Sequence, residues 1–259
     1  MEWKKVKWLI IALLLAVNVF LGINIAIKYS SALKYEKQDL QRAVGLADDS
    51  LGFKLSHFKN LPRYLYSFYG DRDITAEGIF AVTLLGDKGK LETSGGGVYT
   101  YVLPTKERFI FRRGGNLEGI VPLGTEEPGS VIKEALKKQS FDSVETDNGF
   151  TLKYNGTNIY NGGLEYTISG TYVLISGNLP ICYKWEKAEK SRSRGEIVLA
   201  LAQAISDNKV GKLESVSAVY YLQSDGAKGL RLTPAWVAQC SGGKIIISMW
   251  DKSVLSVEK

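Results

Sequence analysis

The side chains that most often perform chemistry in enzymes are sparse in this sequence. His57 is the only histidine, and it lies between apolar residues in the segment LSHFKNLP. One imidazole cannot form a histidine cluster for zinc, and the two cysteines are not in C-x-x-C spacing. No G-x-S-x-G, Walker or G-x-G-x-x-G segment is present. We therefore predict a structural role for His57, no catalytic residue, no metal site and no cofactor.

Carboxylates are the one catalytic resource that the chain has in number. A glycosidase needs only two Asp or Glu side chains across a cleft. Candidates include Asp71, Asp73, Glu165 and Glu186, but no spacing singles out a pair. A carboxylate glycosidase therefore stays open as a minor alternative.

Cys182 and Cys240 lie in apolar stretches far apart in the sequence. On the outer side of a membrane they could form one disulfide. The alternative is two separate buried thiols that behave as small apolar side chains. No spacing rule decides between them, and we favour the separate thiols.

The most polar stretch is residues 184–194, KWEKAEKSRSR, in which five basic residues accompany one Trp. Such a segment could bind an anionic polymer or a lipid headgroup layer. Two Glu residues interrupt the positive charge, and the segment precedes a predicted helix. We favour a solvated loop here. The net charge of +6 is spread along the chain, so we predict no nucleic-acid partner.

The element on which the remaining organisation depends is the run WLIIALLLAVNVFLGINIAI at residues 8–27, which has no charged side chain. As a helix it spans roughly 30 Å, the thickness of a bilayer's hydrocarbon core. Only Asn18 and Asn24 are polar, so no face resembles the polar side of a soluble helix. We predict a transmembrane anchor.

The flanks of this run predict its orientation. Lys4, Lys5 and Lys7 precede it, whereas the charges that follow are mixed. This excess of Lys favours a cytoplasmic tail at residues 1–7 and an extracellular domain in a single-pass protein of the cell membrane. A cleaved signal peptide is the competing interpretation, but its apolar region would usually be about 7 to 15 residues long.

Asn18, Gly22 and Ala26 share one face of the predicted span, at i, i+4 and i+8. Small residues let a second helix approach closely, and an Asn can donate a hydrogen bond across the contact. These three residues are our candidate contact for a partner helix.

A juxtamembrane stalk helix is predicted at residues 28–50. Its apolar positions are Leu33, Leu40, Val44, Ala47 and Leu51, which form one stripe. The stripe could pair with another stalk or dock on the chain's own domain.

Beyond the stalk, helices alternate with groups of short strands. Helices are predicted at 75–85, with Thr75 as a possible N-cap, at 130–139 and at 195–205. Strands are predicted at 97–103, 108–112, 150–154, 164–169, 172–176, 215–223, 230–232, 236–240 and 244–250, with Asn155-Gly156 as a tight turn. This order predicts an α+β fold of antiparallel sheets with packed helices, in two lobes at 51–124 and 125–259.

The anchor with its basic tail, MEWKKVKWLIIALLLAVNVFLGINI, resembles the YycH/YycI family of regulatory proteins of low-GC Gram-positive bacteria. NLPICY, EIVLALAQAI, VSAVYYLQSD and RLTPAWVAQ are similar to that family's ending in order and spacing. The last hairpin departs from it, because Ser248-Met249-Trp250-Asp251 replaces the family's turn. Within RLTPAWVAQ, Pro234 predicts an edge strand or a bulge, and Trp236 predicts core packing.

The resemblance implies a non-catalytic accessory of a two-component system for cell-wall homeostasis. Its partners would be a sensor histidine kinase and a YycH-like sister protein, contacted partly through membrane helices. An anchored binding module for an anionic cell-wall polymer is the principal alternative.

Overall fold

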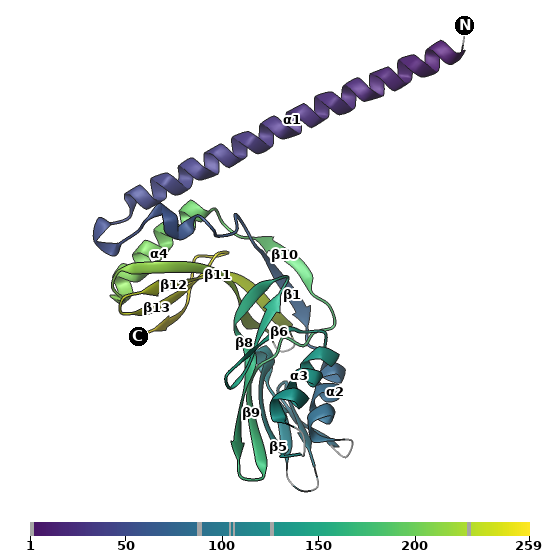
Figure 1. The fold of residues 1–259 in the computed structure, drawn as a ribbon, viewed down its shortest axis with the longest axis vertical. Helices are drawn as coiled ribbons and strands as arrows, with labels where there is room; N and C mark the ends of the chain where they lie inside the picture. The colour runs from purple at the N-terminus through teal and green to yellow at the C-terminus, as the bar shows by residue number, and fades with distance from the viewer. Residues whose placement is uncertain (1–2, 87–89, 104, 106, 125–126, 227–228) are drawn as a thin grey trace.

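The protein is an α+β fold with a long N-terminal helix and a large, mainly antiparallel sheet system (Figure 1). The computed structural model describes residues 3–86, 90–103, 105, 107–124, 127–226 and 229–259. The predicted fold class is confirmed. Met1 and Glu2 of the predicted tail lie outside the described residues.

Helix α1 runs without a break from Trp3–Leu46, through both the predicted span and most of the predicted stalk. It is long and apolar enough to cross a membrane, and its most apolar window is 0% buried within the molecule. This supports a membrane anchor. The stalk ends earlier than predicted, because residues Asp49–Leu51 form a separate 3₁₀ turn, η1.

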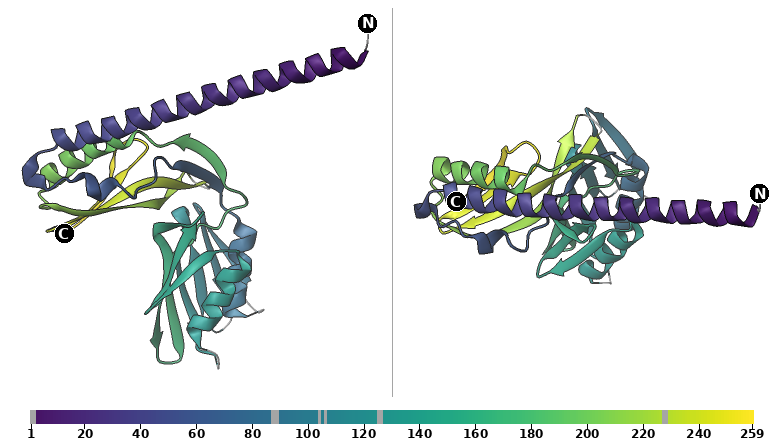
Figure 2. Two further views of the ribbon diagram at one scale, coloured as in Figure 1. Left: turned by 45° about the horizontal axis from the view of Figure 1, so that its top comes forward. Right: turned by 90° about the horizontal axis from the view of Figure 1, so that it is seen from above.

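The apolar stripe of the stalk packs on the chain's own domain. Leu40 is buried in the domain core and Val44 packs against it, and helix α4 (Arg194–Asn208) lies beside this end of α1 (Figure 2). Leu33, the residue of the stripe nearest the predicted span, is exposed. Of the two outcomes open from the sequence, docking on the same chain is the one observed.

The remaining elements follow the predicted alternation. The other helical segments are η2 (Leu55–Phe58), α2 (Ile74–Leu85), η3 (Arg113–Gly115) and α3 (Pro128–Lys138). The strands are β1 (Tyr66–Asp71), β2 (Lys90–Gly95), β3 (Val98–Val102), β4 (Arg108–Phe111), β5 (Asn116–Pro122), β6 (Asp142–Thr146), β7 (Gly149–Tyr154), β8 (Thr157–Ser169), β9 (Tyr172–Asn178), β10 (Glu186–Lys190), β11 (Leu213–Asp225), β12 (Gly229–Cys240), β13 (Gly243–Ser248) and β14 (Val254–Glu258).

Strand β12 is the centre of the C-terminal sheet. It pairs along its whole length with β11 on one edge, and its other edge is shared by β1 and then β13. The prediction that Pro234 marks an edge strand or a bulge is therefore wrong, because β12 is paired on both edges and its register with β11 is regular at Pro234. Pro234 instead lies where this edge changes partner from β1 to β13, so its missing N–H falls at the gap between two ladders.

A second sheet has the order β2-β3-β4-β5-β9-β8-β7-β6, in which all neighbouring strands are antiparallel. Helices α2 and α3 cover one of its faces (Figure 1). One parallel bridge, Tyr220 to Ile159, joins this sheet to β11.

The hydrophobic core has two main parts. One is formed by α2, α3 and the second sheet, and the other by the end of α1, η2, α4 and strands β11 to β13. Val121 and Ile132 belong to the same part, and Tyr220 of β11 also contributes to it. The two parts thus cross the lobe boundary expected between residues 124 and 125. Trp236 is fully buried against Phe58, at 5.5 Å between ring centroids, which confirms its packing role.

Candidate functional site on helix α1

The face formed by Asn18, Gly22 and Ala26 is open. All three residues are exposed, and a Cβ added at Gly22 would meet no atom within 4 Å. Asn24 is satisfied within its own helix, because its Nδ2 donates to the carbonyl of Phe20 at 2.9 Å. No such bond to a described residue is found for the Asn18 amide. The helix thus presents a polar group beside a small-residue notch, as helix–helix contacts in membranes use.

The other end of α1 is fixed by an ion-pair cluster at its contact with α4. Glu36 accepts hydrogen bonds from Arg63 and, at 2.8 Å, from Arg194, and its side chain is only 12% exposed. Burial, together with the nearby positive Arg63, lowers the pKa of Arg194. Such charge-assisted bonds are stronger than neutral ones. Arg63 and Arg194 come from two different segments, so Glu36 ties both to α1.

Asp39, one turn further on, meets the N-terminus of α4. Its carboxylate accepts a bond from the Ser193 hydroxyl at 3.1 Å, and Ser193 in turn caps the helix by accepting from the Glu196 N–H. A Cβ at Gly195 would overlap the Asp39 carboxylate, so a larger residue there would require this carboxylate to move. The negative charge also complements the positive end of the helix dipole. The sequence patterns do not single out Glu36 or Asp39 as contact residues. The one sequence feature that they share is a position on the polar side of the amphipathic stalk.

The carboxylates considered for catalysis are dispersed. Asp73 is the N-cap of α2, where Thr75 was predicted, and it accepts the Ala76 N–H at 2.9 Å. Asp71 accepts the hydroxyl of Tyr69, and Glu186 lies exposed on β10. Glu165 on β8 shares a shallow surface depression with Glu118 on β5, where β9 lies between their strands. Of the four acids, no two line the same described cavity.

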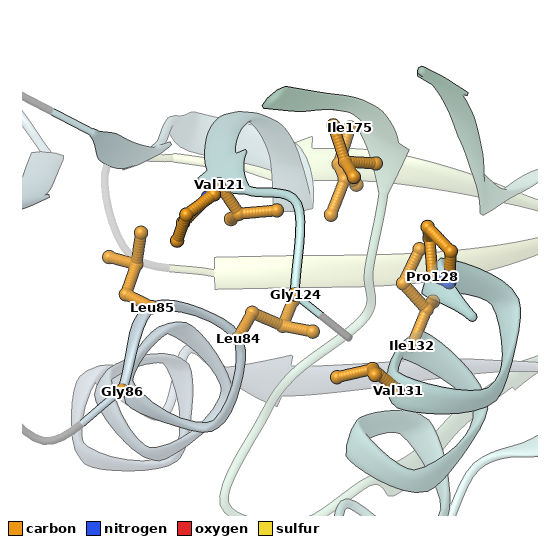
Figure 3. Close-up of a pocket in the computed structure, with 11 residues that line it drawn as sticks. Leu84, Leu85, Gly86, Val121, Gly124, Pro128, Val131, Ile132 and Ile175 are labelled. Carbon is orange, nitrogen blue, oxygen red and sulfur yellow. The ribbon is translucent and has the colours of Figure 1, made fainter. Parts of the chain in front are cut away.

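The described side chains that line one cavity, between the ends of α2 and α3, are all apolar. This cavity has a volume of about 190 Å³, and residues such as Leu84, Val121, Ile132 and Ile175 line it (Figure 3). Among the described residues, none of its lining side chains can act as an acid, a base or a nucleophile.

A larger cavity, of about 410 Å³, lies beside the start of α2. Asp73, Asp142, Lys153 and Cys182 line it together with aromatic side chains. Burial raises the pKa of the Cys182 thiol to about 12, so its thiolate is disfavoured. A nucleophilic role for Cys182 has no support from this environment.

The two thiols are free in the described structure, and they belong to different parts of the core. Cys182 packs against the core of the second sheet, and Cys240 is buried in the core beneath α4. Burial raises the pKa of Cys240 to about 11. The favoured prediction of two separate thiols agrees with this placement. His57, in η2, is also a packing residue: burial lowers its pKa, and its ring lies 6.4 Å from that of Phe58.

The prediction of a loop at residues 184–194 is wrong in part. Residues Glu186–Lys190 form β10, which pairs with β1, while every residue of β10 remains exposed. Hydrophobic periodicity is the usual sequence signal for a strand. Strand β10 has mixed charges and no buried side, so its sequence lacks this signal.

No protein-family model matches the chain, and no curated protein sequence matches it. An uncharacterized protein from Eubacterium rectale is similar in structure, with a TM-score of 0.45 and 11% identity over 76% of this chain and 87% of that one. The C-terminal domain of YpeB from Bacillus megaterium is similar with a TM-score of 0.32 and 13% identity, over 73% of this chain and 98% of that one. No family assignment follows from these similarities.

Proposed function

We propose that the protein is a membrane-anchored, non-catalytic accessory regulator that acts by contact with other membrane proteins. The observation that carries this proposal is the contrast between the two ends of α1. Its most apolar window is 0% buried by the described residues, whereas Glu36 and Asp39 bind its other end to the domain. A partner that engages the free part would therefore be coupled directly to the folded domain.

The resemblance of the anchor and the C-terminal segments to the YycH/YycI family, and to YycI in particular, suggests the partners. They would be a sensor histidine kinase that governs cell-wall homeostasis and a YycH-like sister protein. The lysines before the span favour a cytoplasmic N-terminus with the domain outside the cell. Asn18, Gly22 and Ala26 would form the contact face.

A substitution in the span tests this proposal. Gly22→Leu fills the notch with an apolar side chain that lipid accommodates well, so only a helix partner should be disturbed. We expect at least a several-fold loss of kinase co-purified from mild detergent. Ala16→Leu adds similar bulk about 120° round the helix from Gly22 and is the matched control.

Photo-crosslinkers at positions 18 and 22 would identify the partner directly. Unchanged co-purification of the kinase by the Gly22→Leu variant would move the contact to the outer domain. Failure to capture any histidine kinase from either position would contradict the proposed partner.

A further inference from the structure

Part of the folded domain reaches back to the level at which the membrane span ends. Tyr29 follows the predicted span by two residues, and the Arg63 guanidinium lies 5.9 Å from the centre of the Tyr29 ring. Arg63 is held in place by its ion pair with Glu36. Two residues of helix rise only about 3 Å. The segment that begins at Arg63 therefore starts at the height of the lipid headgroups whenever α1 spans a bilayer.

The residues that follow Arg63 carry a surface typical of a membrane interface. Tyr64 and Tyr66 flank the inward-facing Leu65, and their rings meet edge to face at 5.6 Å between centroids. The Nζ of Lys187 lies 3.4 Å from the centre of the Tyr66 ring, and that of Lys190 lies 4.0 Å from the centre of the Tyr64 ring. We call Tyr64, Tyr66, Lys187 and Lys190 the tyrosine–lysine patch. Tyrosines concentrate at headgroup level, and lysines there attract anionic lipids.

The patch lies on the side of the domain along which α1 runs. Figure 1 and the left view of Figure 2 show β10 on the side of the domain that faces α1. Among the described residues, β10 pairs with β1 alone, so its outer edge is open. The patch is thus both near the anchor and accessible.

The acids near the patch do not cancel its charge. Glu189 accepts the Ser67 hydroxyl at 2.9 Å and lies 3.7 Å from Arg231. Glu36 is engaged by Arg63 and Arg194. Residues 184–194 hold five basic and two acidic side chains, which leaves a positive local charge.

From this placement, we propose that the tyrosine–lysine patch lies against the headgroup layer of an anionic bilayer and forms a second membrane contact beside α1. The contact would hold the domain in one orientation on the membrane, with β10 as its membrane-facing edge. This inference depends on α1 spanning a bilayer and not on which protein α1 meets, so it goes beyond the proposed regulatory role.

The test is amide hydrogen exchange on the full chain, at one copy per lipid nanodisc. Discs that contain phosphatidylglycerol are compared with discs of phosphatidylcholine alone and with detergent micelles. We expect slower exchange for 63–66 and 186–190 in anionic discs only. In the Lys187→Gln/Lys190→Gln variant, the equilibrium constant for forming this contact should fall by about 30-fold, because each lysine contributes about 1 kcal/mol.

The matched control is Lys137→Gln/Lys138→Gln, which removes two exposed lysines from α3 in the other part of the domain. It should leave the protection of β10 unchanged. Equal exchange in anionic and neutral discs would overturn the proposal. So would protection that persists in micelles and rises with protein concentration, which indicates a second copy on the β10 edge. Protection produced in micelles by an anionic polymer, and absent in anionic discs, would favour a polymer site instead.

Discussion

Glu36 joins α1 to two separate segments of the domain, and removing its charge gives the sharpest test of how the anchor is coupled. Glu36→Gln keeps the shape of the side chain but removes the charge that Arg63 and Arg194 share. The Glu36 side chain is 12% exposed and that of Arg194 is 15% exposed, so water can only partly replace the lost partner. The two guanidinium groups would then repel each other without a compensating charge.

The expected loss follows from this burial. Breaking a fully buried pair costs about 3 to 5 kcal/mol, and single hydrogen bonds to charged groups contribute about 1.5 to 3. Because Arg63 is 28% exposed and can turn toward water, we expect a decrease in the free energy of unfolding of about 2 to 3 kcal/mol. For a chain of this size, that lowers Tm by roughly 5 to 10 °C.

The assay is thermal unfolding of the full chain in detergent micelles, followed by near-UV circular dichroism. Amide exchange of residues 33–46 is measured in parallel, because the stalk should exchange faster once it is released from α4. Glu134→Gln is the control, since Glu134 forms an exposed i,i+4 pair with Lys138. Such pairs contribute about 0.5 kcal/mol at most. If the Glu36 variant were no less stable than the Glu134 variant, the junction would not be held by this cluster.

Two further predictions concern buried titratable groups. Burial raises the pKa of Cys182 to about 12 and that of Cys240 to about 11. Because the thiolate is the reactive form, alkylation of both thiols by iodoacetamide at pH 8 should be at least about 100-fold slower in the folded chain than in urea. Equal rates would show that the thiols are accessible. Burial also raises the pKa of Glu77 above its usual value of 4.5, although the Arg72 ion pair opposes the shift. The folded state then binds the proton more tightly than the unfolded state, so this contribution to stability is present at low pH and lost as pH rises through the folded pKa. Chemical denaturation of wild type and Glu77→Gln from pH 4 to 7 should therefore show the wild type losing stability relative to the variant as pH rises; the opposite slope would refute the assigned direction.

The sequence alone determined the features that depend on local patterns. An uncharged run of 20 residues predicts an apolar helix of membrane-spanning length, because length and hydropathy can be read from the sequence alone. Asn155 and Gly156 both adopt positive φ, of 48° and 75°, as the Asn-Gly dipeptide predicts for a tight turn. Helices α2, α3 and α4 were predicted to within a few residues for the same reason, since their caps and periodicity are local.

Only the tertiary structure decided which segments meet. Glu36, Arg63 and Arg194 are brought together from distant parts of the chain, and nothing in their local spacing predicts the cluster. Strand β10 has no buried face, so it exists only because β1 offers a hydrogen-bonding edge. Pairing of strands and convergence of charges depend on contacts between residues far apart in sequence, and local patterns carry no record of those contacts.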